Sequence, residues 1–165
     1  MAKMIMFHVP SDQALLAAFG EVALRHEHLS YILRMTIKSL AELEVDEALD
    51  ATAFDGASLL RDRIRRLAKQ RLGEGKALLQ LQALVERCRR VTEKRNDYVH
   101  SVWAQELDGE AVRRDSSHQW LPTPSIPELQ ALSKELLALT QELNLARLEG
   151  FILEALVARK KPEEI

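Results

Sequence analysis

The chain of 165 residues has 47% apolar and 29% charged side chains, a size and balance that fit one globular domain over residues 1–165 and argue against intrinsic disorder. Cys88 is its one cysteine, which excludes an intrachain disulfide and a cysteine-based metal site. No run approaches the roughly 18 apolar residues of a membrane span. We therefore expect a cytoplasmic protein without a membrane partner. Residues 59–95 hold 12 of the 23 Lys and Arg residues but only 4 of the 25 Asp and Glu residues, and this basic middle either attracts a polyanion such as nucleic acid or pairs with the acidic parts of the fold.

The first predicted helix begins after Pro10, where Ser11 or Asp12 is a typical N-cap, and extends to about Leu43. Steps of three and four residues place one set of side chains on a single helix face: Leu15, Phe19, Val22, His26, Leu29, Leu33 and Ile37. Residues 44–55 are expected to connect this helix to the next, with a short helical turn at 46–49.

The second predicted helix starts at Asp55-Gly56 and ends near Gly73, since glycine is common just past a helix end. Its basic residues are expected to form a solvated face, or to line a path for RNA together with the cations of the next helix: Arg61, Arg63, Arg65, Arg66, Lys69 and Arg71. The third helix is predicted from Lys76 to His100, with one apolar stripe: Leu78, Leu81, Val85, Cys88 and Val91. The next position on that stripe is Arg95.

Residues 101–121 change character, because Asp108-Gly109 lies between two short runs and is typical of a hairpin turn. We expect a small hairpin or ordered loop there, followed by a linker from Leu121. Ser125 and Glu128 have the spacing of a capping box, and a long apolar stripe predicts one final helix that ends at Lys160. Four helices of this kind predict an all-α fold, a four-helix bundle.

Arg95 occupies a position where the helical pattern asks for an apolar side chain. Burying an unpaired charge is costly, so a buried arginine must meet an anion. That anion is either a carboxylate such as Glu21 or Glu27, in a purely architectural ion pair, or a phosphate that arrives with a ligand. The planar guanidinium suits phosphate because it donates two parallel hydrogen bonds.

Asn96 and His100 lie four residues apart and therefore share one face of the third helix. Arg95 and His100 lie five residues apart, which turns through about 140° on an ideal helix. They converge only if the arginine reaches around, if the helix ends near His100, or if a second subunit completes the site. Histidine titrates near neutral pH and can move the proton of a 2′-hydroxyl or of a leaving oxygen, while arginine holds the charge that builds on phosphorus.

These residues, Arg95-Asn96-Asp97-Tyr98-Val99-His100 late in the third helix, resemble the Arg-x4–6-His signature of HEPN-domain proteins. Trp103 after the histidine also resembles small bacterial HEPN-like proteins. The resemblance implies a helical bundle, usually a homodimer, with Arg95, Asn96 and His100 near the dimer cleft. It implies a metal-independent ribonuclease, in a toxin or defence setting with an antitoxin or regulatory partner, or an inactive RNA-binding or protein-interaction module.

Three roles therefore stay open for this helix: RNA cleavage by Arg95, Asn96 and His100, non-catalytic binding, and a structural ion pair. Basic residues upstream on the same helix, which would bind nucleic acid in the first two cases, are Arg87, Arg90 and Lys94. We expect no cofactor and no metal site, because the sequence has no phosphate-binding glycine loop and no paired-histidine helix.

Overall fold

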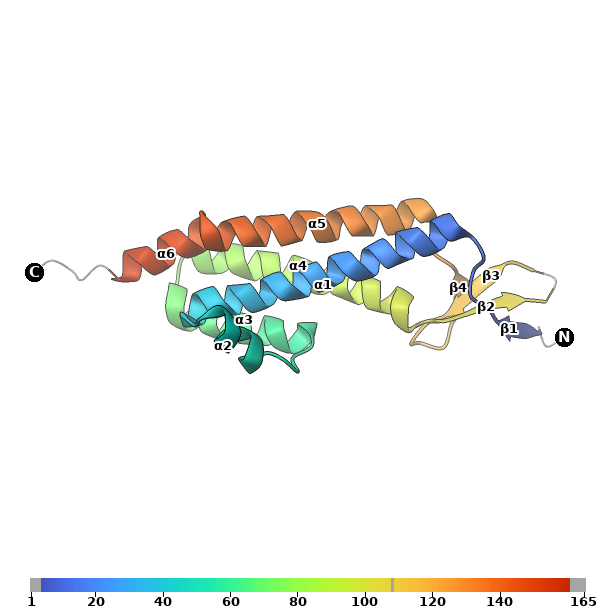
Figure 1. Ribbon diagram of the computed structural model, residues 1–165, viewed down its shortest axis with the longest axis horizontal. Helices are drawn as coiled ribbons and strands as arrows, with labels where there is room; N and C mark the ends of the chain where they lie inside the picture. Colours follow the sequence, from blue (N-terminus) through green and yellow to red (C-terminus); the bar gives the residue numbers. More distant parts are fainter. Residues whose placement is uncertain (1–3, 108, 161–165) are drawn as a thin grey trace, which may run out of the picture.

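Three long helices run along the length of the molecule, and a small sheet lies at one end (Figure 1). The computed structural model describes residues 4–107 and 109–160. The helices are α1 (Gln13–Ala41), α2 (Val45–Ala51), α3 (Ala57–Leu72), α4 (Lys76–His100), α5 (Ile126–Leu148) and α6 (Phe151–Lys160). The strands are β1 (Ile5–Phe7), β2 (Val102–Glu106), β3 (Ala111–Arg114) and β4 (Trp120–Pro122). The predicted helical fold is confirmed. It is not a simple four-helix bundle, because the described chain also contains short helices and a four-stranded sheet.

The starts of α1 and α5 follow the capping chemistry of the sequence. The Asp12 side chain accepts hydrogen bonds from the backbone N–H groups of Ala14 and Leu15, at 2.9 and 3.3 Å. Ser125 and Glu128 form the predicted capping box at the start of α5. Each interaction satisfies N–H groups that have no partner inside the helix. The connection after α1 contains α2, a complete short helix rather than the single turn predicted from the sequence.

The final helix divides in two, which corrects the single helix predicted to Lys160. The backbone N–H groups of Glu149 and Gly150 both donate to the Leu145 carbonyl at 2.9 Å, so the regular ladder stops there. A Cβ at Gly150 would lie 3.2 Å from Ala146 Cα, closer than most such contacts. The glycine therefore permits a tight bend between α5 and α6, and Ile152 is buried beyond it.

The sheet extends the predicted hairpin on both sides in the order β1-β2-β3-β4, with every neighbouring pair antiparallel. The turn residue Asp108 lies outside the described residues. The strands β1 and β4 have three residues each, too short for an alternating pattern to predict them. The linker predicted from Leu121 is wrong at its start, because β4 includes Leu121.

One apolar core joins α1, α3, α4 and α5. The predicted faces are buried, including Leu29 and Leu33 of α1 and Leu136 and Leu139 of α5. The helix α3 lies beside only the part of the bundle remote from the sheet, and α1 and α4 continue past its start (Figure 1). The last turns of α4, which carry Arg95 to His100, therefore lie between the start of α3 and the sheet.

Leu139→Ala tests this packing. The side chain is fully buried, so its truncation removes apolar contacts and leaves a cavity. We expect urea denaturation to show a loss of about 2–5 kcal/mol in the free energy of unfolding. Leu145→Ala on the same helix is the control, because Leu145 is 55% exposed. Equal losses in the two variants would contradict the packing.

Candidate functional site

The end of α4 lines a surface hollow of about 300 Å³, beside the turn between β3 and β4. Its lining residues are Glu93, Asn96, Asp97, His100 and Ser116. Two of the three predicted catalytic residues, Asn96 and His100, therefore face the same space, as their spacing on the helix predicts. His100 is exposed and is the last residue of α4.

Arg95 reaches this hollow through its neighbour in the chain. Its Nη1 donates a hydrogen bond to Asn96 Oδ1 over 3.0 Å. The arginine therefore reaches around the helix toward the face that carries His100. Asn96 links the two predicted catalytic groups, although no described interaction joins Arg95 directly to His100.

The architectural ion pair considered for Arg95 is absent from the described residues. Glu21 instead accepts hydrogen bonds from Arg25 Nε at 3.4 Å and from Ser133 Oγ at 2.9 Å. Glu27 is mostly exposed, and its carboxylate lies 3.9 Å from His26 Nδ1. The Arg95 guanidinium thus remains without a carboxylate partner in the part of the chain that the structure describes.

The carboxylates of the hollow are held by arginines. Glu93 lies 2.5 Å from Arg89 Nη1, and Asp97 lies 2.9 Å from Arg113 Nη1. These ion pairs reduce the negative charge that a phosphodiester would meet there. Arg113 also donates to Ser101 Oγ over 3.0 Å and is buried, so it fastens the sheet to the end of α4.

Behind Arg95 lies a polar cluster that connects α1, α3 and α4. His26 Nε2 and Thr92 Oγ1 are hydrogen-bonded at 3.2 Å. Burial, followed by the positive charge of Arg95, lowers the pKa of His26 to about 4, and Arg61 of α3 acts in the same direction. His26 is therefore a neutral imidazole at pH 7.

Arg61 is 5% exposed, so the solvated face predicted for this segment is wrong at this residue, although Arg66 and Lys69 are exposed as predicted. Its burial, followed by the charge of Arg65, lowers the pKa of Arg61. The signal was present in the sequence, because Arg61 falls on the buried stripe of Ile64, Ala68 and Leu72 just as Arg95 falls on the stripe of α4. Arg113 had no comparable signal, since a four-residue strand gives no pattern.

The predicted nucleic-acid contacts on α4 differ in their availability. Arg87 is bound to Glu142 of α5 at 2.7 Å. Arg90 and Lys94 are exposed, on the part of α4 that leads to the hollow. Two exposed cations therefore remain beside the site, and Arg87 serves an ion pair between helices.

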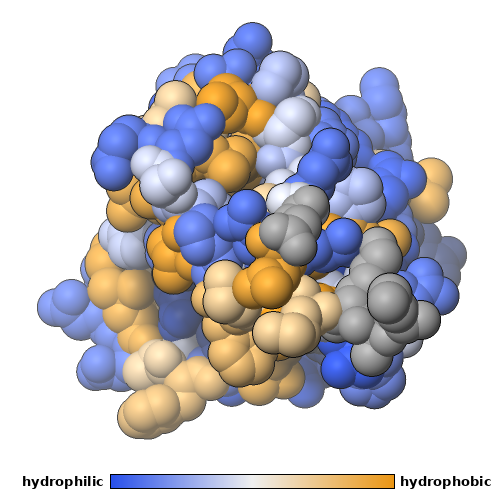
Figure 2. Space-filling model, turned by 90° about the vertical axis from the view of Figure 1, so that its right-hand side faces the viewer, coloured by the Kyte–Doolittle hydropathy of each residue, from blue (hydrophilic) through white to orange (hydrophobic). Residues whose placement is uncertain are grey.

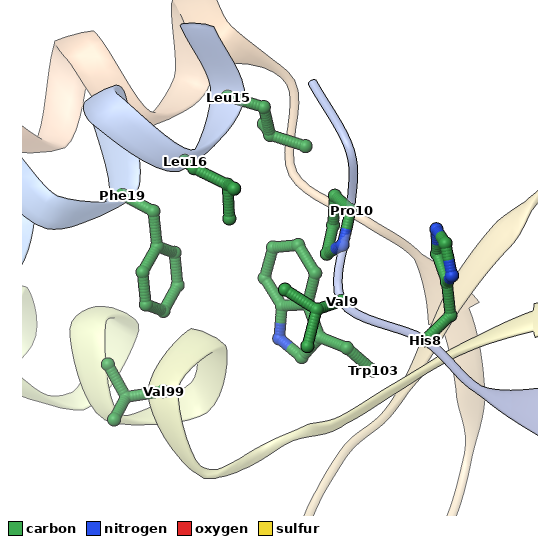
Figure 3. Close-up of a pocket in the computed structure, with 8 residues that line it drawn as sticks. All are labelled: His8, Val9, Pro10, Leu15, Leu16, Phe19, Val99 and Trp103. Atoms are coloured by element: carbon green, nitrogen blue, oxygen red, sulfur yellow. The ribbon is translucent and has the colours of Figure 1, made fainter. Parts of the chain in front are cut away.

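A second, apolar hollow of about 210 Å³ lies where β1 joins α1 (Figure 3). Phe19 and Trp103 meet edge to face there, with their ring centroids 5.3 Å apart. Val9 and Pro10 lie across from them on the segment between β1 and α1 (Figure 3). His8 also lines this hollow, and the contact between Phe19 and Trp103 packs the first turns of α1 against the strand that follows α4.

No protein-family model, curated protein or solved structure matches this chain. Within residues 4–107 and 109–160, no group of three or more His, Cys, Asp or Glu side chains is placed to hold a metal ion. No described helix is long and apolar enough to cross a membrane. The geometry around Arg95 is therefore the basis for a functional assignment.

The lowered pKa of His26 predicts a pH dependence of stability. Between pH 6.5 and 4 the unfolded chain takes up a proton on His26 while the folded chain does not, so the free energy of unfolding falls as the pH falls. We expect His26→Gln, which does not titrate, to lose less stability over this range. Urea denaturation at a series of pH values measures the difference, and equal pH slopes would contradict the burial of a neutral His26.

Proposed function

We propose that the protein is a metal-independent endoribonuclease of the HEPN type that acts in the cytoplasm, with Arg95, Asn96 and His100 as its catalytic residues. One observation carries this proposal: the Arg95 guanidinium has no carboxylate partner among the described residues, and it is hydrogen-bonded at 3.0 Å to an amide that shares a hollow with His100. A structural arginine at this position would be expected to form an ion pair.

The chemistry requires a proton carrier and a cation beside one phosphodiester. His100 moves the proton of the attacking 2′-hydroxyl or of the leaving 5′-oxygen. As the 2′-oxygen bonds to phosphorus and the 5′-oxygen leaves, Arg95 stabilises the negative charge on the phosphoryl oxygens. The products are a 2′,3′-cyclic phosphate and a 5′-hydroxyl. Asn96 holds the guanidinium in place, and no step needs a metal ion.

A cleavage assay on single-stranded RNA with a chelator present tests the proposal. We expect His100→Ala to abolish cleavage and Arg95→Lys to reduce it by about two orders of magnitude or more, because lysine lacks the planar fork. His28→Ala is the matched control, since His28 is an exposed histidine on α1. Circular dichroism confirms that each variant is folded.

Full activity of His100→Ala, or loss of wild-type activity in the chelator, would overturn the assignment. If the wild type and His100→Ala both bind RNA and neither cuts it, the result supports the second candidate function, an inactive HEPN-like binding module. The two carboxylates in the hollow favour that candidate, since they oppose an incoming phosphate unless their arginines stay in place.

A second copy of the chain is the partner that we propose for the sheet. The outward face of the sheet carries Phe7, Val102 and Trp120, which are 88%, 45% and 41% exposed. The opposite face carries Trp103 and Arg113 and packs on the helices. Figure 2 shows apolar side chains gathered at this end of the molecule. Val102 follows His100 by two residues, so a dimer through this face would bring two hollows close together.

Sedimentation velocity tests the dimer. We expect a wild-type dimer at micromolar concentration and a monomer after Phe7→Ser, because the substitution removes an aromatic anchor from the outward face. Phe54→Ser is the control, since Phe54 is fully exposed in the turn between α2 and α3. A monomeric wild type, or equal dissociation of the two variants, would contradict this partner.

A further inference from the structure

Two guanidiniums and one imidazole share the interior near the start of α3. Arg61 comes from α3, Arg95 from α4 and His26 from α1. Arg61 and His26 are each 5% exposed, and both arginines act electrostatically on the His26 ring. Thr92 lies one turn before Arg95 and fixes the ring through its hydroxyl at 3.2 Å.

Several N–H groups of this cluster have no hydrogen-bond acceptor among the described residues. The Nε and Nη1 atoms of Arg61 and the Nε of Arg95 are buried without a hydrogen-bond partner there. The His26 Nδ1 is also buried without a hydrogen bond, with the Glu27 carboxylate 3.9 Å away. Buried polar groups in folded proteins almost always have a partner. Several unsatisfied nitrogens in one cluster therefore point to an acceptor from outside the described chain.

Charge balance leads to the same conclusion. The carboxylates near Arg61 are already bound, because Asp62 pairs with Arg65 at 2.8 Å and Glu93 pairs with Arg89 at 2.5 Å. Cys88 contributes no anion, since burial raises the pKa of its thiol to about 12. A missing acceptor that also carries negative charge would neutralise the cluster.

Phosphate fits this cluster better than a carboxylate does. Arg61 alone offers two unsatisfied N–H donors and Arg95 adds one from another helix, while the His26 ring lies beside them. A carboxylate has two acceptor oxygens, whereas a phosphate group presents more oxygens in a tetrahedral arrangement. Arginine is also the side chain best suited to phosphate, through parallel charge-assisted hydrogen bonds.

We propose that Arg61, Arg95 and His26 form a binding site for a phosphate group, with access beside the half-buried Arg95. If the phosphate belongs to RNA, this inference rests on the proposed function. Arg61, which lies on α3 and is not part of the Arg-x4-His signature, is in that case a further phosphate-binding residue. Binding of free phosphate requires no cleavage activity. Because Arg95 is common to both sites, phosphate at this cluster lies next to the hollow of His100.

Thermal unfolding in inorganic phosphate and in chloride at equal ionic strength tests the site. We expect phosphate to raise the unfolding temperature of the wild type, because a ligand that binds only the folded state stabilises it. Arg61→Met should weaken phosphate binding by on the order of tenfold or more, since two charge-assisted hydrogen bonds are lost. Arg66→Met is the matched control on the exposed side of α3 and should bind as the wild type does.

Arg61→Met is expected to fold, because methionine replaces a buried unpaired charge with an apolar chain of similar length. An equal phosphate effect in all three proteins, or no effect beyond that of chloride, would overturn the site. His100→Ala should keep phosphate binding while it loses RNA cleavage, so failure of this site and failure of the cleavage proposal are separate results.

The ring of His26 gives a readout that needs no variant. Its surroundings comprise Glu27 on α1, Arg61 on α3, and Thr92 and Arg95 on α4. Bound phosphate adds negative charge, so NMR should show the protonation midpoint of His26 rising. An unchanged midpoint in saturating phosphate would overturn the proposal.

A 2′-deoxy oligonucleotide, which cannot undergo attack by a 2′-hydroxyl, separates the two sources of phosphate. Displacement of inorganic phosphate by this oligonucleotide supports a site for nucleic acid. Failure to displace it overturns the RNA form of the proposal and assigns the site to free phosphate.

Discussion

Arginine at an apolar position of a helix interface constrains this fold at two points. Arg61 on α3 and Arg95 on α4 both occupy stripes that are otherwise apolar, and neither has an ion pair within the described chain. A buried unpaired guanidinium opposes folding by several kcal/mol, whereas an apolar replacement is often neutral or stabilising. Such residues are expected where function, rather than stability, requires them.

The fold makes this arrangement tolerable by leaving α4 incompletely covered. Since α3 begins only partway along the bundle, Arg95 stays half-buried and its guanidinium reaches the Asn96 amide. The sheet then fixes the end of α4, because Arg113 holds Asp97 and Trp103 Nε1 donates to the Tyr98 carbonyl over 3.0 Å. His100, as the last helical residue, is positioned by both.

The helical part of this structure follows from the sequence because periodicity and capping are local. The stripe of α1, the Asp12 cap and the Ser125 capping box all lie within a few residues of each other, and the placement of Asn96 and His100 on one face follows from helix geometry alone. The bend at Gly150 was missed because a glycine on an apolar stripe indicates close helix packing as readily as a break.

Local sequence patterns could not predict whether Glu21 or Glu27 pairs with Arg95, for a different reason. Glu21 and Glu27 lie on the neighbouring helix, but Glu21 is taken by Arg25 and Ser133 and Glu27 points to the surface. Those choices depend on how α1 rotates against α4 and α5. The convergence of Arg61 and His26 likewise depends on where α3 begins along the bundle, which no pattern in the sequence specifies.

The Arg95 guanidinium, held without a carboxylate partner among the described residues, is the group that we expect an incoming phosphate to contact first. The direct measurement is the Nε–H resonance of Arg95 in a ¹H–¹⁵N NMR titration with a 2′-deoxy oligonucleotide, which has no 2′-hydroxyl and therefore binds without being cut. We expect a saturable shift of this resonance at the concentrations that also shift the ring of His100. An unmoved Arg95 resonance, with shifts confined to the exposed arginines of α3, would contradict it.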